Sequence, residues 1–196
     1  MHRSERIRPI VALFGAIAVV LSACGAPTAP SGAASIGTFE LDLFVADGST
    51  ASATGPVLED GVAYQVEVQG TYSIWGSTLW SAGSCGGAPE DEPMFPSPGG
   101  ANGTVGVDAG FYFAVPDGSA LCSGPVPRAS NSLDFSVDGG ATYADPEPIG
   151  APAAPDPDHT YRFALVGQGL PVQVKREDSP SDDNYGRLQL EVFRQP

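Results

Sequence analysis

The chain has 196 residues and a formal net charge of −14, with 9 basic against 23 acidic residues. Proteins that bind nucleic acids neutralise phosphates with several basic groups on one face, and the only adjacent basic pair here is Lys175-Arg176. The charge balance therefore excludes nucleic acid as a partner. Gly and Pro are frequent, but a hydrophobic fraction of 42% predicts a packed core. The length fits one domain with an appendage.

The first residues have the pattern of an export signal. Residues 2–9 contain three arginines, and the twelve residues 10–21 are apolar and uncharged. A membrane-spanning helix needs about 20 apolar residues, so this run is too short to span a bilayer. Its order of basic, apolar and small residues is that of a secretory signal. We therefore expect residues 1–23 to be a signal peptide.

The signal ends in Leu21-Ser22-Ala23-Cys24, which resembles the lipobox of bacterial lipoproteins. In that family a branched aliphatic residue, a small residue and Gly or Ala precede a Cys that is lipidated and becomes the mature N-terminus. The resemblance implies that Cys24 carries acyl chains such as palmitate and that the membrane is a partner through this anchor. It also implies a place on the extracytoplasmic face of the cell membrane or envelope. The alternative is a free thiol at the end of an apolar helix.

The remaining chain divides into a linker and a β domain. Small residues and prolines dominate residues 24–37, which we expect to form the lipidated Cys and a flexible linker. Over residues 38–196 apolar residues recur with period two between turn residues, and no comparable helical stretch is present. The pattern predicts an all-β fold, a β-sandwich or jelly roll of about eight strands. The expected strands are residues 39–44, 62–68, 71–75, 104–115, 132–137, 161–166, 171–175 and 187–193.

Turns and loops separate these strands. Asp138-Gly139-Gly140 and Asp47-Gly48-Ser49 supply residues for tight turns that need positive φ. Two longer segments, residues 83–103 and 145–159, are expected to be loops. Recurrent prolines favour the extended polyproline II conformation in the second loop, which we expect to cross between the sheets.

Two cysteines, Cys85 and Cys122, remain once Cys24 is assigned to the lipid. An exported domain lies in an environment where disulfides form and persist, so we expect these two to pair. The competing interpretation is a metal pair, but a zinc site would lack half of its ligands there.

Side chains for catalysis are scarce. Beyond the signal the only His is His159, and no Gly-x-Ser-x-Gly elbow is present, so a Ser-His-Asp triad is not indicated. We interpret His159 as a residue at the entry to a strand, and we expect a protein that is not an enzyme. A glycoside hydrolase with paired carboxylates is the alternative, because such pairs are abundant. They occur at Glu90-Asp91-Glu92, Glu177-Asp178 and Asp182-Asp183.

The most distinctive motif lies at residues 177–188, where four carboxylates and Asn184 share a short loop between two predicted strands. Ca²⁺ takes six to eight oxygen ligands, and acidic side chains, amides and carbonyls around tight turns can supply them. The spacing is not that of an EF-hand. An acidic hairpin turn with local side-chain caps and no ion explains the motif equally well.

The loop is similar to the calcium loop of the PA-IL type galactophilic lectins, a small jelly-roll family. The resemblance implies that calcium is a cofactor and that Asp178, Asp183 and Asn184 are ligands, with Ser181 or Asp182 as the carbonyl donor in the turn. Upstream, residues 70–76 resemble a family segment whose Tyr gives a backbone carbonyl to the same ion. Trp75 occupies that place. The family's sugar-contacting His and Gln have no equivalents in residues 83–121.

Two aromatic residues, Trp80 and Phe95, lie in or near a predicted loop and are candidates for stacking on a carbohydrate. Tyr72 alternates with Ile74 and is expected in the core instead. The leading hypothesis is a lipid-anchored, non-catalytic β-sandwich that binds a ligand, a glycan in a calcium-dependent manner or an envelope protein. A surface hydrolase and a purely structural envelope protein are the alternatives.

Overall fold

Two antiparallel sheets pack against each other in the computed structural model, which describes residues 32–76, 79, 85–86, 106–130, 133–150, 152–178 and 180–196. These residues belong to one compact unit, Gly32–Pro196. The predicted signal peptide and Cys24 lie outside the described residues. No helix among those described has the length and apolar character needed to cross a membrane.

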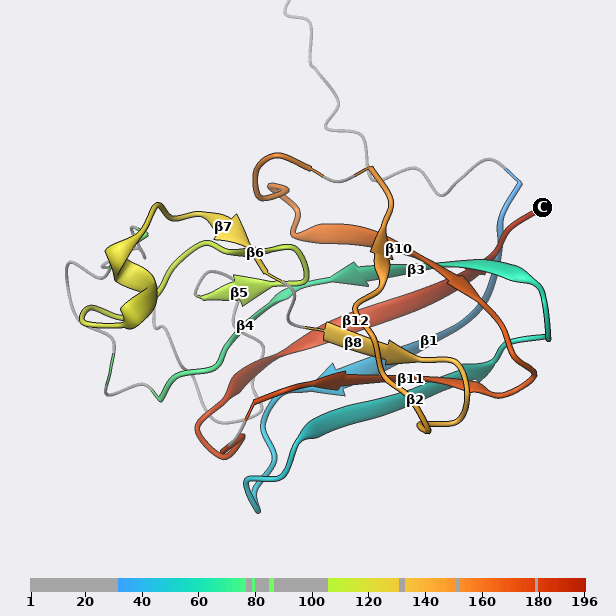
Figure 1. Ribbon diagram of the computed structural model, residues 1–196, viewed down its shortest axis with the longest axis horizontal. Coiled ribbons are helices and arrows are strands. Elements are labelled where there is room, and N and C mark those ends of the chain that lie inside the picture. Colours follow the sequence, from blue (N-terminus) through green and yellow to red (C-terminus); the bar gives the residue numbers. More distant parts are fainter. Residues whose placement is uncertain are drawn as a thin grey trace, which may run out of the picture. The chain divides into compact units, whose positions relative to one another are not determined.

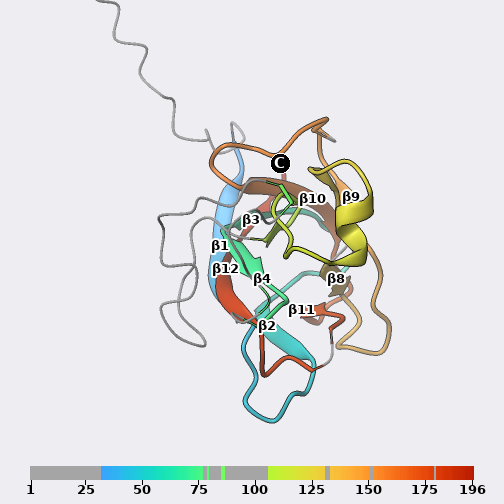
Figure 2. The same cartoon turned by 90° about the vertical axis from the view of Figure 1, so that its left-hand side faces the viewer.

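The larger sheet has the strand order β7-β6-β5-β4-β12-β3-β10-β9, with β1 on the other side of β12, and the smaller sheet has the order β2-β11-β8. Figure 1 shows β12 running through the larger sheet, and Figure 2 shows the smaller sheet below it. The strands are β1 (Ala34–Asp42), β2 (Ala51–Val57), β3 (Ala63–Gln69), β4 (Thr71–Ser73), β5 (Val107–Asp108), β6 (Phe111–Tyr112), β7 (Arg128–Ala129), β8 (Leu133–Ser136), β9 (Glu147–Pro148), β10 (Thr160–Val166), β11 (Pro171–Arg176) and β12 (Tyr185–Arg194).

The prediction of an all-β sandwich is confirmed. The described residues hold twelve strands where about eight were expected. The difference arises because five strands have only two or three residues, which is too short for a period of two to be recognised in the sequence. The described part contains no α-helix, and residues Ala120–Ser123 form a short 3₁₀ helix.

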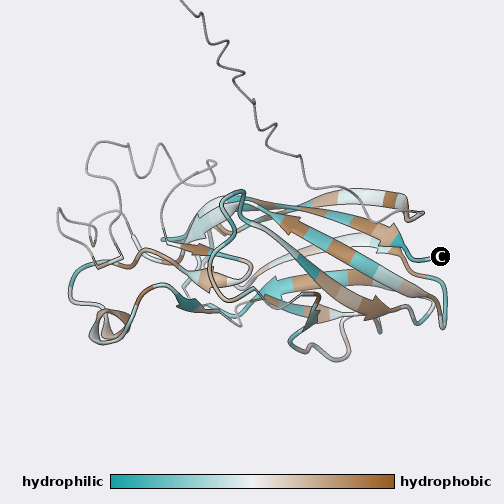
Figure 3. Cartoon of the chain, turned by 90° about the horizontal axis from the view of Figure 1, so that it is seen from above, coloured by the Kyte–Doolittle hydropathy of each residue, from teal (hydrophilic) through white to brown (hydrophobic). Residues whose placement is uncertain are grey.

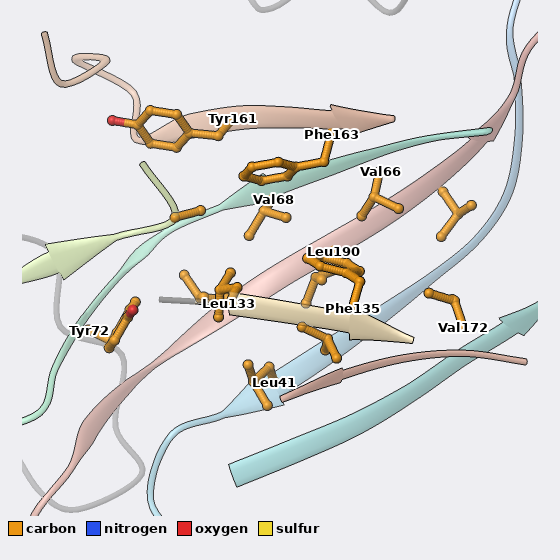
Figure 4. Close-up of a cluster of buried hydrophobic side chains, with 14 of the residues drawn as sticks. Leu41, Val66, Val68, Tyr72, Leu133, Phe135, Tyr161, Phe163, Val172 and Leu190 are labelled. Carbon is orange, nitrogen blue, oxygen red and sulfur yellow. The ribbon is translucent and has the colours of Figure 1, made fainter. Parts of the chain in front are cut away.

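The core lies between the two sheets. Along β11 the side chains of Val172 and Val174 are fully buried, while Gln173 between them is partly exposed. The same alternation in β12 buries Leu188, Leu190 and Val192, and Figure 3 shows it as brown and teal bands along the long strands. Figure 4 shows how side chains from both sheets meet. Full burial of such a side chain contributes roughly 1.5–3 kcal/mol. Tyr72 is also fully buried, as predicted.

Strand β2 was not predicted, because Gly55 and Pro56 within it are both unfavourable in strands. It lies at the edge of the smaller sheet, where a missing backbone N–H is tolerated. Gly55 is required by close packing. A Cβ at this position would lie 2.5 Å from Cε1 of Phe39, so the Phe39 ring occupies the space that a side chain would need.

The prediction of a single strand at residues 104–115 is wrong. The described part of this segment forms two short strands, β5 and β6, joined by a turn at Ala109-Gly110. The Asp108 carboxylate causes the turn, because its Oδ1 accepts hydrogen bonds from the backbone N–H of Gly110 and of Phe111. We predicted one strand because the segment is rich in aromatic residues, and we did not consider that Asp108 could form a turn.

Strand β1 begins at Ala34, inside the segment expected to be a linker up to residue 37. Its first side chains are largely exposed, so burial does not order them. Backbone pairing does, because Ala34 and Ser35 lie opposite Arg194 and Phe193 of β12. We predicted a flexible linker here because the composition allows little burial of side chains. That argument does not include the backbone hydrogen bonds to a neighbouring strand.

The proline-rich segment 145–159 crosses between the sheets, as predicted. Just before it, Ala144 forms a bridge with Phe135 of β8 in the smaller sheet. A few residues later Glu147 and Pro148 pair with Ala164 and Phe163 of β10 in the larger sheet. The segment therefore links the two sheets along one side of the sandwich.

The turn after β8 has the geometry predicted for Asp138-Gly139-Gly140, with φ of 78° and 89° at the two glycines. The Asp138 carboxylate accepts hydrogen bonds from the side chain and backbone N–H of Thr142 and from the Ser136 hydroxyl. These bonds, the Thr142 hydroxyl first, lower the pKa of Asp138 from its ordinary value of 3.8. The ionised carboxylate therefore favours the folded state.

The pKa of Asp138 is lower in the folded state than in the unfolded state, so its ionised form stabilises the fold. This contribution is complete at pH values above the unfolded-state pKa, and it is lost as the pH falls toward the folded-state pKa. Asp138→Ala is thus expected to lower the thermal transition at neutral pH. Its difference from the unchanged protein should shrink as the pH falls from about 4 to about 2. Thermal unfolding over this range tests the assignment, and a difference that stays constant down to the lowest pH would contradict it.

Candidate functional site

The segment 177–184, named the acidic crossover here, joins two strands of different sheets. β11 ends at Arg176 in the smaller sheet, and β12 begins at Tyr185 in the larger one. The expectation that this segment closes a hairpin is therefore wrong. It followed from the adjacency of the two strands in the sequence, because consecutive strands usually pair. Here they form opposite layers of the sandwich.

Two of the predicted ligands, Asp178 and Asp183, lie near each other in the acidic crossover. Burial raises the pKa of the Asp183 carboxyl, the charge of Asp178 raises it further, and a hydrogen bond from the Gly76 backbone N–H opposes both effects. The segment that follows β4 is thus close to Asp183. It is held there because Tyr185 of β12 pairs with Ser73 of β4. Two carboxylates and a stretch of backbone converge at this end of the sandwich.

Buried polar atoms without partners mark the same place. Asn184 is fully buried, and within the described part of the chain neither its Oδ1 nor its Nδ2 has a hydrogen-bond partner. Oδ2 of Asp178 is likewise buried without a partner among those residues. Buried polar side chains are almost always satisfied by protein, water or an ion. These atoms are therefore the strongest indication that a water or a cation belongs in the crossover.

The remaining predicted ligands, Trp75 and Asp182, have different surroundings. The Trp75 carbonyl accepts a hydrogen bond of 3.2 Å from the Ser73 hydroxyl. The Trp75 ring packs edge-on against Tyr112, with ring centroids 6.3 Å apart. Asp182 is exposed. Its influence on Asp183 is the weakest of those that raise that pKa, so it lies at the rim.

The predicted ligands of the acidic crossover are oxygen atoms. No group of three or more His, Cys, Asp or Glu side chains that could hold a metal occurs among the described residues. Zinc sites are built from such groups, whereas Ca²⁺ also accepts amide and carbonyl oxygens. The set formed by Asp178, Asp183, Asn184 Oδ1 and the Trp75 carbonyl is of the second kind.

Arg176, just before the crossover, was not singled out in the sequence. Its side chain is only 7% exposed. One Nη lies 3.5 Å from the Tyr112 hydroxyl, the other donates to the Glu177 carbonyl, and Nε has no partner among the described residues. The sequence did contain a signal for its burial. Arg176 follows Val172 and Val174 at intervals of two residues, and this spacing places all three on the inward face of β11.

A second polar centre, at Asp108, was also missed. Asp108 is fully buried, and its Oδ2 is 2.9 Å from the Tyr161 hydroxyl and 2.8 Å from Nδ1 of His159. The Tyr161 hydroxyl also accepts a hydrogen bond from the Asp156 backbone N–H. Figure 4 shows the Tyr161 hydroxyl pointing away from the apolar cluster. With the two backbone N–H groups of the turn after β5, four donors converge on one carboxylate.

The placement of His159 at the start of β10 is as predicted, but its role is larger than strand entry. Its φ of 50° lies in the left-handed region, which costs a non-glycine residue free energy. Its ring packs on Phe113, with ring centroids 4.9 Å apart. The contact with Asp108 holds this conformation, so His159 fastens the end of the proline-rich segment to the larger sheet. Burial raises the pKa of Tyr161, and its hydroxyl stays protonated as a donor.

The predicted disulfide between Cys85 and Cys122 is present, with the two Cα atoms 5.6 Å apart. Cys122 belongs to the 3₁₀ helix, and the Cys85 carbonyl accepts a hydrogen bond from the Val115 backbone N–H. The bond therefore ties two distant stretches of chain together beside β6.

Removal of this disulfide is expected to destabilise the domain by about 2–5 kcal/mol, the usual loss for a native disulfide. The double variant Cys85→Ser/Cys122→Ser should show this loss in thermal unfolding without reductant, and reduction should bring the unchanged protein close to it. Alkylation that finds both thiols free in exported protein would contradict the assignment.

The aromatic candidates Trp80 and Phe95 and the acidic run Glu90-Asp91-Glu92 lie outside the described residues. Their roles therefore stay predictions.

Comparison with known proteins adds no assignment. No protein family, curated protein or solved structure matches the chain.

Proposed function

We propose that the chain is an exported lipoprotein, anchored through Cys24, whose β-sandwich binds a ligand without catalysing a reaction and holds Ca²⁺ in the acidic crossover. The observation that carries the calcium proposal is that the buried oxygens Asn184 Oδ1 and Asp178 Oδ2 have no hydrogen-bond partner among the described residues. The lipobox-like sequence before Cys24 supports the anchor. The disulfide supports export, because such bonds are stable in oxidising compartments.

Two unfavourable features of the acidic crossover favour a bound calcium ion. Asn184 is buried, and its amide oxygen has no partner in the part of the chain that the structure describes. Leaving such an acceptor unsatisfied costs about 1–3 kcal/mol. Asp178 and Asp183 repel each other in the same region. A hard cation with oxygen ligands offsets both costs at once. A water molecule would satisfy Asn184 but would not neutralise the carboxylates.

Calcium is therefore expected to raise the thermal transition of the protein. A ligand that binds only the folded state stabilises it by about 2.7 kcal/mol at a hundredfold excess over Kd. Magnesium should have a smaller effect, because it requires a stricter octahedral site and dehydrates reluctantly. The measurement is thermal unfolding of the detergent-solubilised protein in EDTA, with Ca²⁺ and with Mg²⁺.

The matched control for this experiment is Asp60→Ala. Asp60 is an exposed carboxylate in the turn between β2 and β3, away from the acidic crossover. Asp178→Ala should remove the calcium response, while Asp60→Ala should retain it. Equal shifts with both cations, or equal losses in both variants, would mean that the ions only screen the negative charge of the protein, and the calcium site would have to be abandoned.

A further inference from the structure

We propose that a groove on the outer face of the smaller sheet binds the hydroxyl groups of a neutral glycan. The proposal deepens the proposed ligand-binding function by locating the site and naming the ligand class. The groove has a volume of about 620 Å³, which is within the usual range for small-molecule sites. Its lining residues are Thr50, Ser52, Tyr143, Lys175, Glu177 and Asp178.

The groove follows from the alternation along β11. Val172 and Val174 face the core, so Gln173 and Lys175 face outward. Lys175 lies opposite Ser52 of β2 on one side and opposite Asp134 of β8 on the other. A row of polar side chains thus crosses the outer face of the sheet, and Glu177 and Asp178 close the row at the end where the acidic crossover begins.

Lys175 is held in place at the centre of the groove. Its Nζ lies 2.6 Å from Glu177 Oε1 and 3.7 Å from Asp134 Oδ2. The same ammonium lies 4.6 Å from the centroid of the Tyr143 ring, and the Tyr143 hydroxyl is fixed by a 2.7 Å hydrogen bond to Gln173. The hydrogen bond with Glu177 raises the pKa of Lys175, so the ammonium stays charged. An ordered donor loses little entropy when a ligand binds.

The groove offers donors and acceptors close together. The ammonium carries three N–H donors and cannot accept, the carboxylates of Glu177 and Asp178 can only accept, and the hydroxyls of Thr50 and Ser52 can do either. A sugar hydroxyl donates one hydrogen bond and accepts others. Neighbouring hydroxyls on a sugar ring can therefore satisfy the ammonium and a carboxylate at the same time.

The charge of the groove selects against anions. The Lys175 ammonium lies between the carboxylates of Asp134 and Glu177, so the surroundings stay negative overall even when Ca²⁺ neutralises Asp178. Burial and the charge of Glu177 raise the pKa of Asp134, and the Lys175 ammonium opposes them. Sulfated, phosphorylated or uronic-acid ligands would add a further negative charge. A neutral hexose or N-acetylhexosamine unit would not.

The test is binding of the full-length, detergent-solubilised lipoprotein to an array of neutral hexose and N-acetylhexosamine oligosaccharides, with sulfated and uronic-acid oligosaccharides beside them. We expect binding to neutral members. Lys175→Met should weaken it by about tenfold or more, because charge-assisted hydrogen bonds are lost. Thr50→Val should weaken it less, and it changes only an exposed loop residue, so a folding defect is not expected.

The matched control is Arg187→Met. Arg187 is also a surface cation in ion pairs, with Glu40 and Asp42, but it lies on the larger sheet. The Arg187→Met variant should leave glycan binding unchanged. No retention of neutral glycans, preferential retention of anionic ones, or equal losses with Lys175→Met and Arg187→Met would overturn the proposal.

The groove and the calcium site can fail separately. A calcium-dependent rise in the thermal transition without glycan binding rejects the groove and leaves the calcium site. Binding of neutral glycans that is lost with Lys175→Met supports the groove even where calcium has no effect on unfolding.

Discussion

Cys24→Ala is expected to abolish membrane association completely. Each buried methylene of an acyl chain contributes about 0.8 kcal/mol, so two or more chains hold a protein firmly on a bilayer. The formal net charge of −14 disfavours adsorption of the chain to anionic lipid, so the charge does not replace the acyl chains. The variant should stay unlabelled by radioactive palmitate.

The matched control for the anchor is Cys85→Ser, which removes a thiol from the same chain but leaves Cys24. This control should still partition with membranes and take up label, although it is destabilised. Fractionation and acyl labelling of both variants decide the matter. A Cys24→Ala protein that sediments with membranes and takes up label would contradict the lipoprotein assignment.

Asp108→Ala is expected to be the most destabilising of the substitutions considered that leave the disulfide intact, with a loss of about 4 kcal/mol. The change leaves the backbone N–H groups of Gly110 and Phe111, the Tyr161 hydroxyl and the His159 ring without their acceptor in a buried place. Buried donors without partners carry their full desolvation cost. Because a folded domain is stable by only roughly 5–15 kcal/mol, such a loss is a large part of the whole.

The control for this prediction is Asp47→Ala. Asp47 also accepts a hydrogen bond from a backbone N–H two residues on, that of Ser49, but it is exposed. Its loss should destabilise the domain much less than Asp108→Ala does, because water replaces the carboxylate. Urea unfolding of the two variants gives the comparison. Similar losses in both would show that the buried network contributes no more than an ordinary turn.

The layers of the fold could be predicted because the long strands carry the period of two in their apolar residues. β3, β10, β11 and β12 were recognised in this way. β2 could not be, because Ala, Gly and Pro give no such signal, and its place depends on the Phe39 ring that covers Gly55. Sheet membership was equally hidden. Nothing local in residues 177–184 distinguishes a hairpin from a crossover.

The candidate site was predictable in its residue types but not in its geometry. The acidic cluster and its likeness to a calcium loop were visible in the sequence, whereas the burial of Asn184 with both amide atoms unpartnered among the described residues depends on packing. The contact between Asp108 and His159 joins residues 51 positions apart. The groove around Lys175 likewise combines three separate segments, and a sequence pattern reports only neighbours along the chain.

The calcium site in the acidic crossover is tested most directly by Asp183→Asn, measured in thermal unfolding with EDTA and with Ca²⁺. Burial and Asp178 disfavour the charge of Asp183 in the folded protein, so removing that charge should leave the transition in EDTA unchanged or raise it. The same variant exchanges a charged ligand for a neutral amide oxygen, so its transition should respond to Ca²⁺ much less than that of the unchanged protein. A response equal to that of the unchanged protein would contradict the site.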